Sequence, residues 1–387
     1  MIDVTPADAG RLGDIVRSAR PGTTIRFADG VYPVTGDYSK SLVISKPGIT
    51  LRGASGDPAK VVLDGQYSIG AIVYVSADDA TITDLTLKRA EDHLVHSYPG
   101  PSGPDVKGLT LHRVRMIDSG EQFLKVNPNV TRANFVDAGR VLCSEFTMTS
   151  AGRANIERAY GCYTGGIDVH SGRDWIVRSN TFQGIYCEDG EVAEHAIHFW
   201  VGSRDTIVEN NFIQNTSRGI GFGLVENGPS RAYPDNPYPG MFVGHYGGTI
   251  RNNVIIADIP QYDTGIELDQ ARGSKVVHNT VVETGSATGS FSSIDYRFPN
   301  TSVSVHNNLV RRITVRNGAV GTVSHNVENV PVSWFVNAAA GNVHVRNTAA
   351  GAINRGLALG STLAGRDLDG FPHALGPPDI GADEYLS

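Results

Sequence analysis

A repeated unit that ends in asparagine is the feature that most constrains the fold of this chain. Five segments align on it: DWIVRSNTF (174–182), DTIVENNFI (205–213), GGTIRNNVI (247–255), GSKVVHNTVV (273–282) and TSVSVHNNLV (301–310). From Asn180 through Asn211, Asn253 and Asn279 to Asn307, the equivalent asparagines are 31, 42, 26 and 28 residues apart. A period of roughly 20 to 50 residues is typical of proteins built from stacked repeats.

The uneven period favours one kind of repeat protein. A propeller blade needs four strands and a steady length of about 40 residues, whereas a coil of three short strands fits about 25 residues and accepts insertions. Asparagine suits the turn between strands, because it tolerates a left-handed backbone and its amide can bond to the asparagine of the next coil. With 45 glycines and 19 prolines among 387 residues, we expect an all-β, single-stranded parallel β-helix.

The rest of the chain fits one such domain over residues 1–387. Leu12, Ile15 and Val16 have helical spacing, and we expect residues 5–20 to form a helix that caps the first coil. Segments 128–161 and 226–248 exceed the length of a solenoid turn and are expected to be inserted loops. Residues 365–387 are expected to form an irregular strap over the other end.

Three motifs carry a resemblance to a known group of proteins. ARPGTTIRFADGVY (19–32), ITLRGASGDPAKVVLDG (49–65) and PPDIGADEY (377–385), together with the asparagine repeats, resemble the secreted bacterial right-handed parallel β-helix proteins of the pectate-lyase-like superfamily. The resemblance covers nearly the whole chain. It implies a right-handed helix and a carbohydrate-active protein, since the superfamily includes polysaccharide lyases, glycoside hydrolases and uronan epimerases.

Charge and composition exclude several partners. The net charge is −7 and no lysine or arginine cluster is evident, so we expect no nucleic-acid partner. No apolar run approaches the roughly 20 residues of a membrane span. The chain begins without a secretory signal, so we expect a secreted or periplasmic protein whose leader is absent from this sequence, or a cytoplasmic one.

The three cysteines, Cys143, Cys162 and Cys187, allow at most one disulfide, and buried thiols are favoured.

Strand alternation predicts which side chains leave the coil. On each strand before an asparagine turn, the apolar residues should face inward and their neighbours outward. Coils stacked about 4.8 Å apart would bring these outward residues into one strip suited to a polymer. The strip comprises Lys125, Asn127, Asp168, His170, His198, Trp200, Glu267, Asp269, Asp295 and Arg297.

These residue types suit β-elimination on an acidic polysaccharide that contains uronic acid. The reaction needs a base for the C5 proton, cations or amides for the C6 carboxylate, and an acid for the leaving O4. Lys125 or His170 would be the base, Arg297 and Asn127 would hold the carboxylate, and His198 would be the acid. The residues expected to orient these groups or to contact the sugar are Asn127, Asp168, Trp200, Glu267, Asp269, Asp295, His245 and Tyr246.

Other functions remain open at this stage. Glu267 and Asp269 would lie about 7 Å apart on one strand face, which suits the paired carboxylates of a glycoside hydrolase. Epimerisation uses the same base and charge neutralisation as the lyase. A glycan-binding surface protein without catalysis would show the same core and strip. We assign no metal or cofactor, although Glu267, Asp269 and Asp295 offer the oxygen ligands that calcium prefers.

Overall fold

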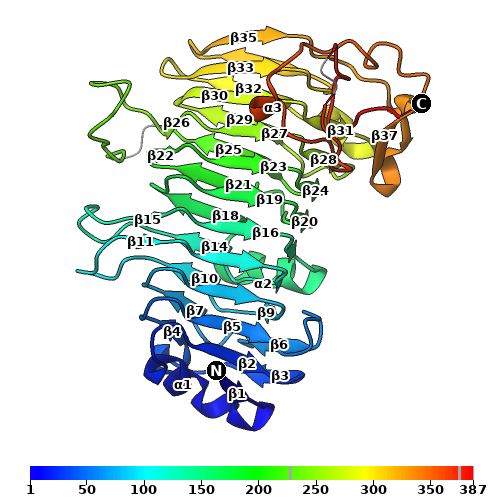
Figure 1. Ribbon diagram of the computed structural model, residues 1–387. Coiled ribbons are helices and arrows are strands. Elements are labelled where there is room, and N and C mark those ends of the chain that lie inside the picture. The colour runs from blue at the N-terminus through cyan, green and yellow to red at the C-terminus, as the bar shows by residue number, and fades with distance from the viewer. Residues whose placement is uncertain (226–228, 374–375, 387) are drawn as a thin grey trace. The chain divides into compact units, whose positions relative to one another are not determined.

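The computed structural model of this protein describes residues 1–225, 229–373 and 376–386. The chain divides into two units, Met1–Ile176 with Asn180–Ile197, and Val177–Ser179 with His198–Ser387. Each unit is a stack of short parallel strands arranged in three sheets (Figure 1), which confirms the expected parallel β-helix. The boundaries between the units fall inside strands β19 (Ile176–Arg178) and β21 (His195–Trp200).

The first unit contains three sheets that we name A1, B1 and C1. A1 contains β1 (Ile2–Val4), β2 (Thr24–Phe27), β5 (Thr50–Gly53), β8 (Thr81–Thr83), β12 (Thr110–His112) and β16 (Arg140–Leu142). B1 contains β3 (Gly30–Pro33), β6 (Val61–Asp64), β9 (Thr86–Lys88), β13 (Arg115–Ile117), β17 (Glu145–Thr147) and β20 (Thr181–Gln183). C1 contains β4 (Leu42–Ile44), β7 (Ala71–Val75), β10 (His93–Ser97), β14 (Gln122–Val126) and β18 (Gly165–His170).

The second unit contains the corresponding sheets A2, B2 and C2. A2 contains β22 (Ser203–Arg204), β23 (Ile207–Glu209), β26 (His245–Tyr246), β27 (Thr249–Arg251), β30 (Ala271–Val277), β33 (Ser302–His306) and β35 (Val320–Ser324). B2 contains β24 (Phe212–Gln214), β28 (Val254–Ala257) and β31 (Thr280–Glu283). C2 contains β25 (Arg218–Gly223), β29 (Thr264–Asp269), β32 (Ser292–Arg297) and β34 (Ile313–Arg316).

The remaining elements are short and lie outside these sheets. The first unit adds a two-stranded pair, β11 (Val106–Lys107) with β15 (Val136–Asp137), and the helices η1 (Pro6–Arg11), α1 (Leu12–Ser18), η2 (Tyr38–Lys40) and α2 (Ser150–Tyr160). The second unit adds an antiparallel hairpin, β36 (Phe335–Asn337) with β37 (Asn342–Val345), and the helices η3 (Gly285–Gly289), η4 (Val332–Trp334), η5 (Ala338–Ala340) and α3 (Ser361–Ala364).

The N-terminal helix is present as expected, but it is shorter than residues 5–20. Thr5 caps the first turn, since its backbone N–H donates to Asp8 Oδ2 at 2.8 Å. That turn is a 3-10 helix, and the α-helix α1 follows it. Leu12 and Val16 of α1 are buried, and α1 lies beside β4 at the N-terminal end of the first unit (Figure 1). This helix therefore covers apolar residues of the first coil.

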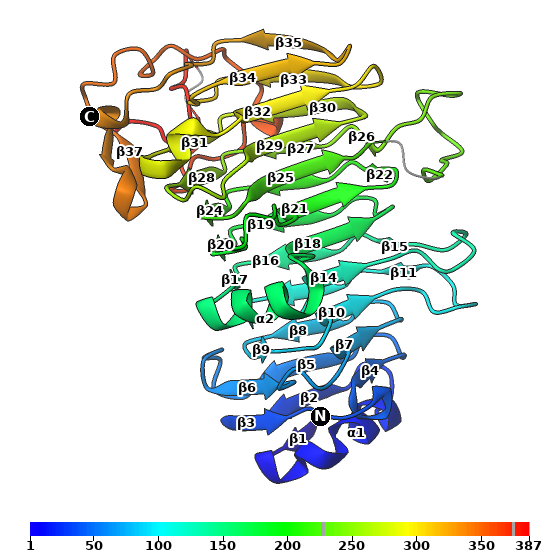
Figure 2. The same ribbon diagram turned by 180° about the vertical axis from the view of Figure 1, so that it is seen from behind.

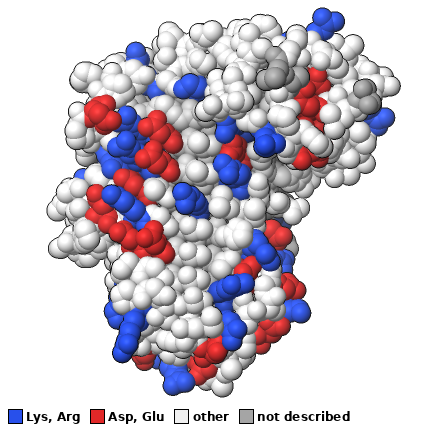
Figure 3. Space-filling model, viewed as in Figure 1, with Lys and Arg blue, Asp and Glu red and all other residues white. Residues whose placement is uncertain are grey.

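The core of the first unit is a column of like residues. Leu51, Ile82, Leu111 and Val141 pair in register on four successive strands of A1, and all four are fully buried. Burying one such side chain contributes about 1.5–3 kcal/mol. The alternating outward positions of this sheet carry mainly threonines, such as Thr50, Thr81 and Thr110, with arginines at some of them. Figure 3 shows basic and acidic side chains mixed in small groups on the face that it draws.

A ladder of asparagine side chains runs through the second unit. The Nδ2 of Asn211 donates to Oδ1 of Asn253 at 2.9 Å, and Asn253 donates to Asn279 at 3.0 Å. Asn279 donates to Asn308 at 3.0 Å, and Asn308 to Asn326 at 2.8 Å. The repeats therefore stack through buried amide hydrogen bonds, one for each coil.

The ladder corrects one residue of the sequence alignment. The equivalent of Asn279 is Asn308, 29 residues further on, and not Asn307. The residue before each ladder asparagine takes the left-handed backbone instead: φ is 54° at Asn252, 55° at His278 and 58° at Asn307. In an Asn-Asn pair the first residue therefore makes the turn and the second makes the ladder.

The expectation that residues 128–161 form one inserted loop is wrong. This segment contains two regular strands of the coil, β16 and β17, followed by helix α2. The turn between these strands has Ser144 where other coils have asparagine, and Ser144 fills the same place: its backbone N–H donates to Asn180 Oδ1 at 2.9 Å. The repeat was hidden because its marker residue differs.

Of the segment expected to be an inserted loop at 226–248, residues 226–228 lie outside the described part of the chain; residues 229–244 are irregular, and β26 follows them. Tyr233, Val243 and Tyr246 form a small apolar cluster within it. The strap at 365–387 is irregular over its described residues, 365–373 and 376–386. Among the described residues, no helix has the length and apolar character needed to cross a membrane.

The cysteines differ from expectation. Cys162 and Cys187 form a disulfide, and Cys143 is free and exposed. Buried thiols were the favoured prediction, and it fails because α2 and the loop before β21 bring two cysteines that are 25 residues apart to a Cα–Cα distance of 5.9 Å.

Candidate functional site

Five polar side chains meet on sheet C1: His96, Lys125, Asn127, Asp168 and His170, which we call the lysine cluster. They come from β10, β14 and β18 and the residue after β14, and Figure 2 shows these three strands side by side. In the parallel register His96 pairs with Lys125, and Lys125 with Asp168. Asn127 and His170 lie two residues further along, on the same face. The structure thus brings together four residues of the predicted strip.

A continuous set of contacts joins the lysine cluster. The Nζ of Lys125 donates to Asp168 Oδ2 and lies 3.3 Å from His170 Nε2. His170 Nε2 is also 3.3 Å from Asp168 Oδ2, and His170 Nδ1 is 3.3 Å from Asn127 Nδ2. On the other side, His96 Nε2 lies 3.0 Å from Asn127 Oδ1. The side chains of Lys125 and Asp168 are each 9% exposed, and that of His170 is 17% exposed.

The surroundings keep Lys125 charged. Burial alone would lower the pKa of Lys125, but the Asp168 carboxylate, Tyr163 and Glu121 outweigh it, and the pKa is raised. Lys125 is therefore an ammonium ion at neutral pH. This assignment favours a role in neutralising negative charge over the role of a base.

The neutral state of His96 orders the hydrogen bonds of the cluster. Burial lowers the pKa of His96 to about 4, although its hydrogen bond to Asn127 favours the charged form. A neutral His96 donates its Nε2–H to Asn127 Oδ1, so the Asn127 amide nitrogen faces His170 and donates to Nδ1. The remaining N–H of a neutral His170 is then at Nε2, directed to Asp168.

An aromatic surface adjoins the lysine cluster and was missed in the sequence. The Tyr74 ring centroid lies 4.9 Å from that of Tyr38, 5.6 Å from that of His96 and 6.5 Å from that of Tyr98, while His96 and Tyr98 are 5.2 Å apart. Tyr38 is 54% exposed. Strand alternation could have found these residues. It predicts outward side chains for His96 in HLVHS (93–97), one coil before Lys125, and for Tyr74 in AIVYV (71–75), two coils before it.

A second charged cluster occupies sheet C2, and we call it the arginine stack: Glu267, Asp269, Asp295, Arg297 and Arg316. Arg297 donates to Glu267 Oε1 and, from Nε, to Asp269 Oδ1 at 2.7 Å. Arg316 donates to both oxygens of Asp295, from Nη2 at 2.9 Å and from Nε at 3.1 Å. The three carboxylates are at most 6% exposed at their side chains. Each acid therefore has an arginine partner.

The arginines decide what the three acids can do. Burial raises the pKa of Asp269 to about 7, and the Glu267 carboxylate adds to this, although Arg297 opposes it. Oxygens of Glu267, Asp269 and Asp295 lie within 4.8 Å of one another, which suits an ion. Because Arg297 already bridges two of them, we assign no calcium ion here.

The expected catalytic group falls into two clusters. Lys125 and His170 contact each other in the first unit. Arg297 belongs to the second unit, where its ion pairs are with Glu267, Asp269 and Asp295. The contacts therefore do not place Arg297 with Lys125, and its expected role at the substrate carboxylate loses its support.

His198 and Trp200 are stacked on each other in the second unit, with ring centroids 5.4 Å apart. His198 is 2% exposed, and its Nε2 lies 2.9 Å from the carbonyl oxygen of Gly223. A buried histidine that donates to a backbone carbonyl is a poor acid for a substrate, so the assignment of His198 is corrected. Trp200 is partly exposed and keeps an expected role in sugar contact.

The expectation that His245 and Tyr246 contact a sugar is also corrected. His245 is fully buried, stacks on Phe222 with centroids 3.9 Å apart, and its Nε2 lies 3.0 Å from Thr206 Oγ1. Tyr246 is 3% exposed and packs on Tyr233. Both belong to β26, where successive side chains point to opposite faces: His245 contacts the core residue Phe222, and Tyr246 is covered by Tyr233.

Comparison with known proteins identifies the fold. No protein-family model and no curated protein sequence matches the chain. Among solved structures, pectate lyase Pel9A aligns over 100% of this chain and 96% of its own, at 14% identity, with a TM-score of 0.61. This protein has the pectate-lyase-like right-handed parallel β-helix fold.

Other solved structures are similar to this chain at lower TM-scores. The surface adhesin PfbA of Streptococcus pneumoniae aligns over 85% of this chain and 98% of its own, at 10% identity, with a TM-score of 0.48. An alginate lyase from Paenibacillus sp. str. FPU-7 aligns over 84% and 98%, at 14% identity, with a TM-score of 0.44. Polysaccharide lyases and glycoside hydrolases are both among the structural neighbours. At these identities the likeness extends to the fold alone.

Proposed function

We propose that this protein is a polysaccharide lyase that cleaves a uronic-acid-containing polysaccharide by β-elimination at the lysine cluster. The main support is the contact network of one ammonium, one carboxylate, two imidazoles and one amide on three adjacent strands. These groups provide a cation, a base and an amide within hydrogen-bond reach of one another, which is what the reaction requires.

Lys125 and Asn127 hold the C6 carboxylate of the sugar in this mechanism. Removing the C5 proton places negative charge on that carboxylate, so a nearby cation lowers the barrier. Lys125 remains protonated beside Asp168, and the Asn127 amide nitrogen is a second donor. Lys125 is thus the charge-neutralising group, and of the two predicted bases only His170 is retained.

His170 is the base for the C5 proton. Its Nε2–H is directed to Asp168, which fixes the ring and stabilises the imidazolium that forms. Its Nδ1 accepts from Asn127 while no substrate is bound. When the Asn127 amide donates to the sugar carboxylate instead, the Nδ1 lone pair can accept the C5 proton. The electrons of the C5–H bond then form the C4–C5 double bond as the C4–O4 bond breaks.

A tyrosine beside the cluster protonates the leaving O4. Tyr98 stacks near His96, and Tyr163 lies close enough to Lys125 to raise its pKa and is 45% exposed. Either hydroxyl can donate a proton as the bond breaks. The exposed ring of Tyr38 and the half-buried ring of Tyr74 provide faces for further sugar rings of the polymer.

Two alternatives are less well supported. A glycoside hydrolase that uses Glu267 and Asp269 needs these carboxylates at the scissile bond, but both are buried and bridged by Arg297. A glycan-binding protein without catalysis needs no base and no buried cation, although the aromatic surface alone would suit it.

We also propose that the protein is exported to the periplasm or secreted. The Cys162–Cys187 disulfide supports this location, since disulfides persist in oxidising compartments and are rare in the cytosol. An acidic polysaccharide outside the cytoplasm is then accessible to it.

A panel of uronans and neutral glycans tests the proposed function. We expect one uronan to give an unsaturated uronic-acid product, detected by its ultraviolet absorbance, and we expect His170→Ala to abolish that product. New reducing ends without the unsaturated product would instead indicate hydrolysis. Binding without any turnover would indicate a glycan-binding protein, and either result would overturn the lyase.

A further inference from the structure

A histidine and two aspartates that belong to neither charged cluster meet in the C-terminal part of the second unit. His344 is on β37, while Asp369 and Asp383 lie in the irregular segment that follows α3. One ligand atom from each residue lies within 4.8 Å of those of the other two. The side chains of His344 and Asp369 are 41% and 42% exposed, and Asp383 is buried. Solvent therefore reaches the group from one side.

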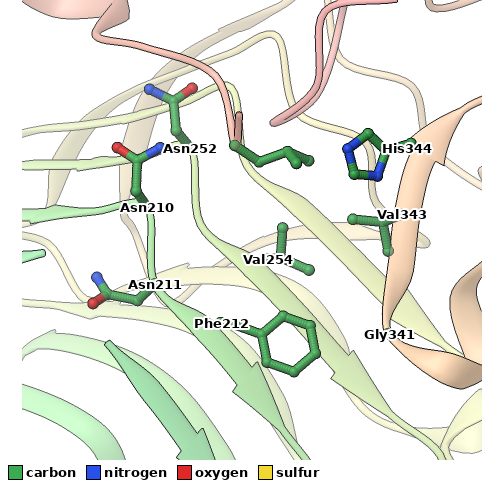
Figure 4. A pocket seen from close by; sticks show the side chains of 9 residues that line it. Asn210, Asn211, Phe212, Asn252, Val254, Gly341, Val343 and His344 are labelled. Atoms are coloured by element: carbon green, nitrogen blue, oxygen red, sulfur yellow. The ribbon is translucent and has the colours of Figure 1, made fainter. Parts of the chain in front are cut away.

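A cavity borders this group. It has a volume of about 180 Å³ and is lined by Asn210, Asn211, Phe212, Asn252, Val254, Gly341, Val343, His344 and Leu368. Figure 4 shows His344 and Val343 on one side of it, with Asn210 and Asn252 on the other. His344 is the imidazole that borders both the cavity and the two aspartates.

The hydrogen bonds of His344 define where its proton lies. The backbone N–H of His344 donates to Asn342 Oδ1 at 3.2 Å, which sets the orientation of that amide. The His344 Nδ1 is 2.9 Å from the same oxygen, and because an amide oxygen only accepts, Nδ1 carries the hydrogen. A neutral imidazole then has a lone pair on Nε2.

That lone pair faces a carboxylate. His344 Nε2 is 3.0 Å from Asp369 Oδ2. Two lone pairs at this distance repel each other unless a cation lies between the two atoms or the imidazole itself carries a second proton. A metal ion bound to both atoms satisfies the distance, since two ligands at about 2.1 Å from a tetrahedral or octahedral ion lie about 3.0–3.5 Å apart. The alternative is a second proton on His344.

Asp367 adds buried negative charge beside the group, although the backbone N–H groups of Asp369 and Phe371 donate to its Oδ1. It is fully buried, and its Oδ2 has no hydrogen-bond partner among the described residues. The backbone of the next residue, Leu368, donates to Ala382 at 2.8 Å, which places Asp367 alongside Asp383. Asp383 Oδ2 accepts the N–H of Val345 at 2.7 Å. Among the described contacts, no arginine or lysine pairs with Asp367 or Asp383. A bound cation would offset the negative charge of these carboxylates.

We propose that His344, Asp369 and Asp383 bind a divalent transition-metal ion, of which Zn²⁺ is the best match. One imidazole and two carboxylates form a ligand set that zinc accepts, with a position left for water, whereas calcium prefers six to eight oxygens and no imidazole. The ion links β37 to the C-terminal segment and stabilises this end of the unit. This site is independent of the proposed lyase activity.

The test uses the full chain after treatment with a chelator. We expect isothermal titration with Zn²⁺ to give one bound ion per chain, and thermal unfolding to shift to higher temperature when Zn²⁺ is added. Titration with Ca²⁺ should give no comparable binding. Co²⁺ in place of Zn²⁺ should produce the visible absorption bands of a tetrahedral ion.

Two variants and one control decide the assignment. His344→Ala and Asp369→Asn should weaken Zn²⁺ binding by at least about 100-fold, and both alter exposed side chains, so the metal-free variants should unfold like the metal-free wild type. His325→Ala removes an exposed histidine outside the group and should leave binding unchanged. Absence of Zn²⁺ binding by the wild type, or equal binding by all three variants, would overturn the proposal and identify the contact as an imidazolium–carboxylate pair.

Discussion

The lysine cluster and the arginine stack use equivalent positions of the coil in different ways. Both consist of outward side chains on sheet C strands, Lys125 and Asp168 in the first unit and Glu267 and Asp295 in the second. In the arginine stack every carboxylate meets a guanidinium, and the group consists only of ion pairs. In the lysine cluster a single ion pair is surrounded by two imidazoles and an amide.

This difference separates stability from chemistry. Matched ion pairs hold neighbouring coils together, and a carboxyl of the arginine stack that takes up a proton, such as Asp269, weakens its own pair with Arg297. The lysine cluster contains donors and acceptors with different proton affinities, held in contact by a rigid sheet. We therefore expect substitutions in the lysine cluster to change turnover, and substitutions in the arginine stack to change the free energy of unfolding.

The largest expected effect is on turnover. Lys125→Ala and His170→Ala should each lower kcat by about 10³-fold, because each removes a group that acts on the reacting sugar. Initial rates of unsaturated-product formation, measured at saturating uronan, test this. Lys107→Ala, which alters an exposed lysine of the same unit, should retain the wild-type rate; comparable losses in all three variants would remove the distinction that we draw.

The second effect concerns stability. Arg297→Met leaves Glu267 and Asp269 buried without their shared partner, and should lower the free energy of unfolding by about 3 kcal/mol with little change in kcat. Urea unfolding followed by circular dichroism measures the loss. Arg26→Met breaks an exposed pair with Asp3 and should leave stability unchanged. A large fall in kcat with intact stability in Arg297→Met would return Arg297 to the active site.

A smaller difference is expected between the turns of the two units. Asn253→Ala removes a ladder amide that donates to Asn279 and to the backbone carbonyl of Val208, and should destabilise by about 2 kcal/mol. Ser144→Ala removes the hydroxyl that fills this place in the first unit, and should destabilise by about 1 kcal/mol. Urea unfolding compares the two, and equal values would mean that the amide ladder adds nothing.

The last prediction concerns the dependence of stability on pH. The pKa of Asp269 in the folded protein is about 7, above its ordinary value of 3.8. The folded state therefore holds this proton more tightly than the unfolded state, and the resulting stabilisation is full below about pH 4 and is lost as the pH rises through about 7. The Asp269→Asn variant has no carboxyl to titrate at this position, so its stability lacks this dependence on pH. The melting temperature of the wild type should fall relative to that of Asp269→Asn between these pH values; a constant difference would contradict the raised pKa.

Much of the fold was predictable because stacking forces repetition. The asparagine pattern and the strand alternation each reflect a local requirement that every coil must meet. The coil at β16 and β17 was not recognised, since Ser144 performs the task of an asparagine through its hydroxyl and its backbone. The disulfide was also missed, because the separation of Cys162 and Cys187 in sequence says little about their distance in space.

The site was predictable only in part. Strand alternation correctly indicates that Lys125, Asn127, Asp168 and His170 share a face, because parity needs no knowledge of loops. Alternation could not show that β26 is a regular strand, and so His245 appeared to be a loop residue. Strand alternation also does not reveal which charged residues pair. Arg297 bridges Glu267 and Asp269 because of side-chain conformations that the alternation pattern does not encode.

A crystal structure of His170→Ala with a bound uronate oligosaccharide tests most directly whether the lysine cluster is the reaction centre. We predict that one sugar carboxylate lies about 3 Å from Lys125 Nζ and from Asn127 Nδ2, with sugar rings over Tyr74. An oligosaccharide bound with its scissile bond at Glu267 and Asp269, and none at Lys125, would contradict this assignment.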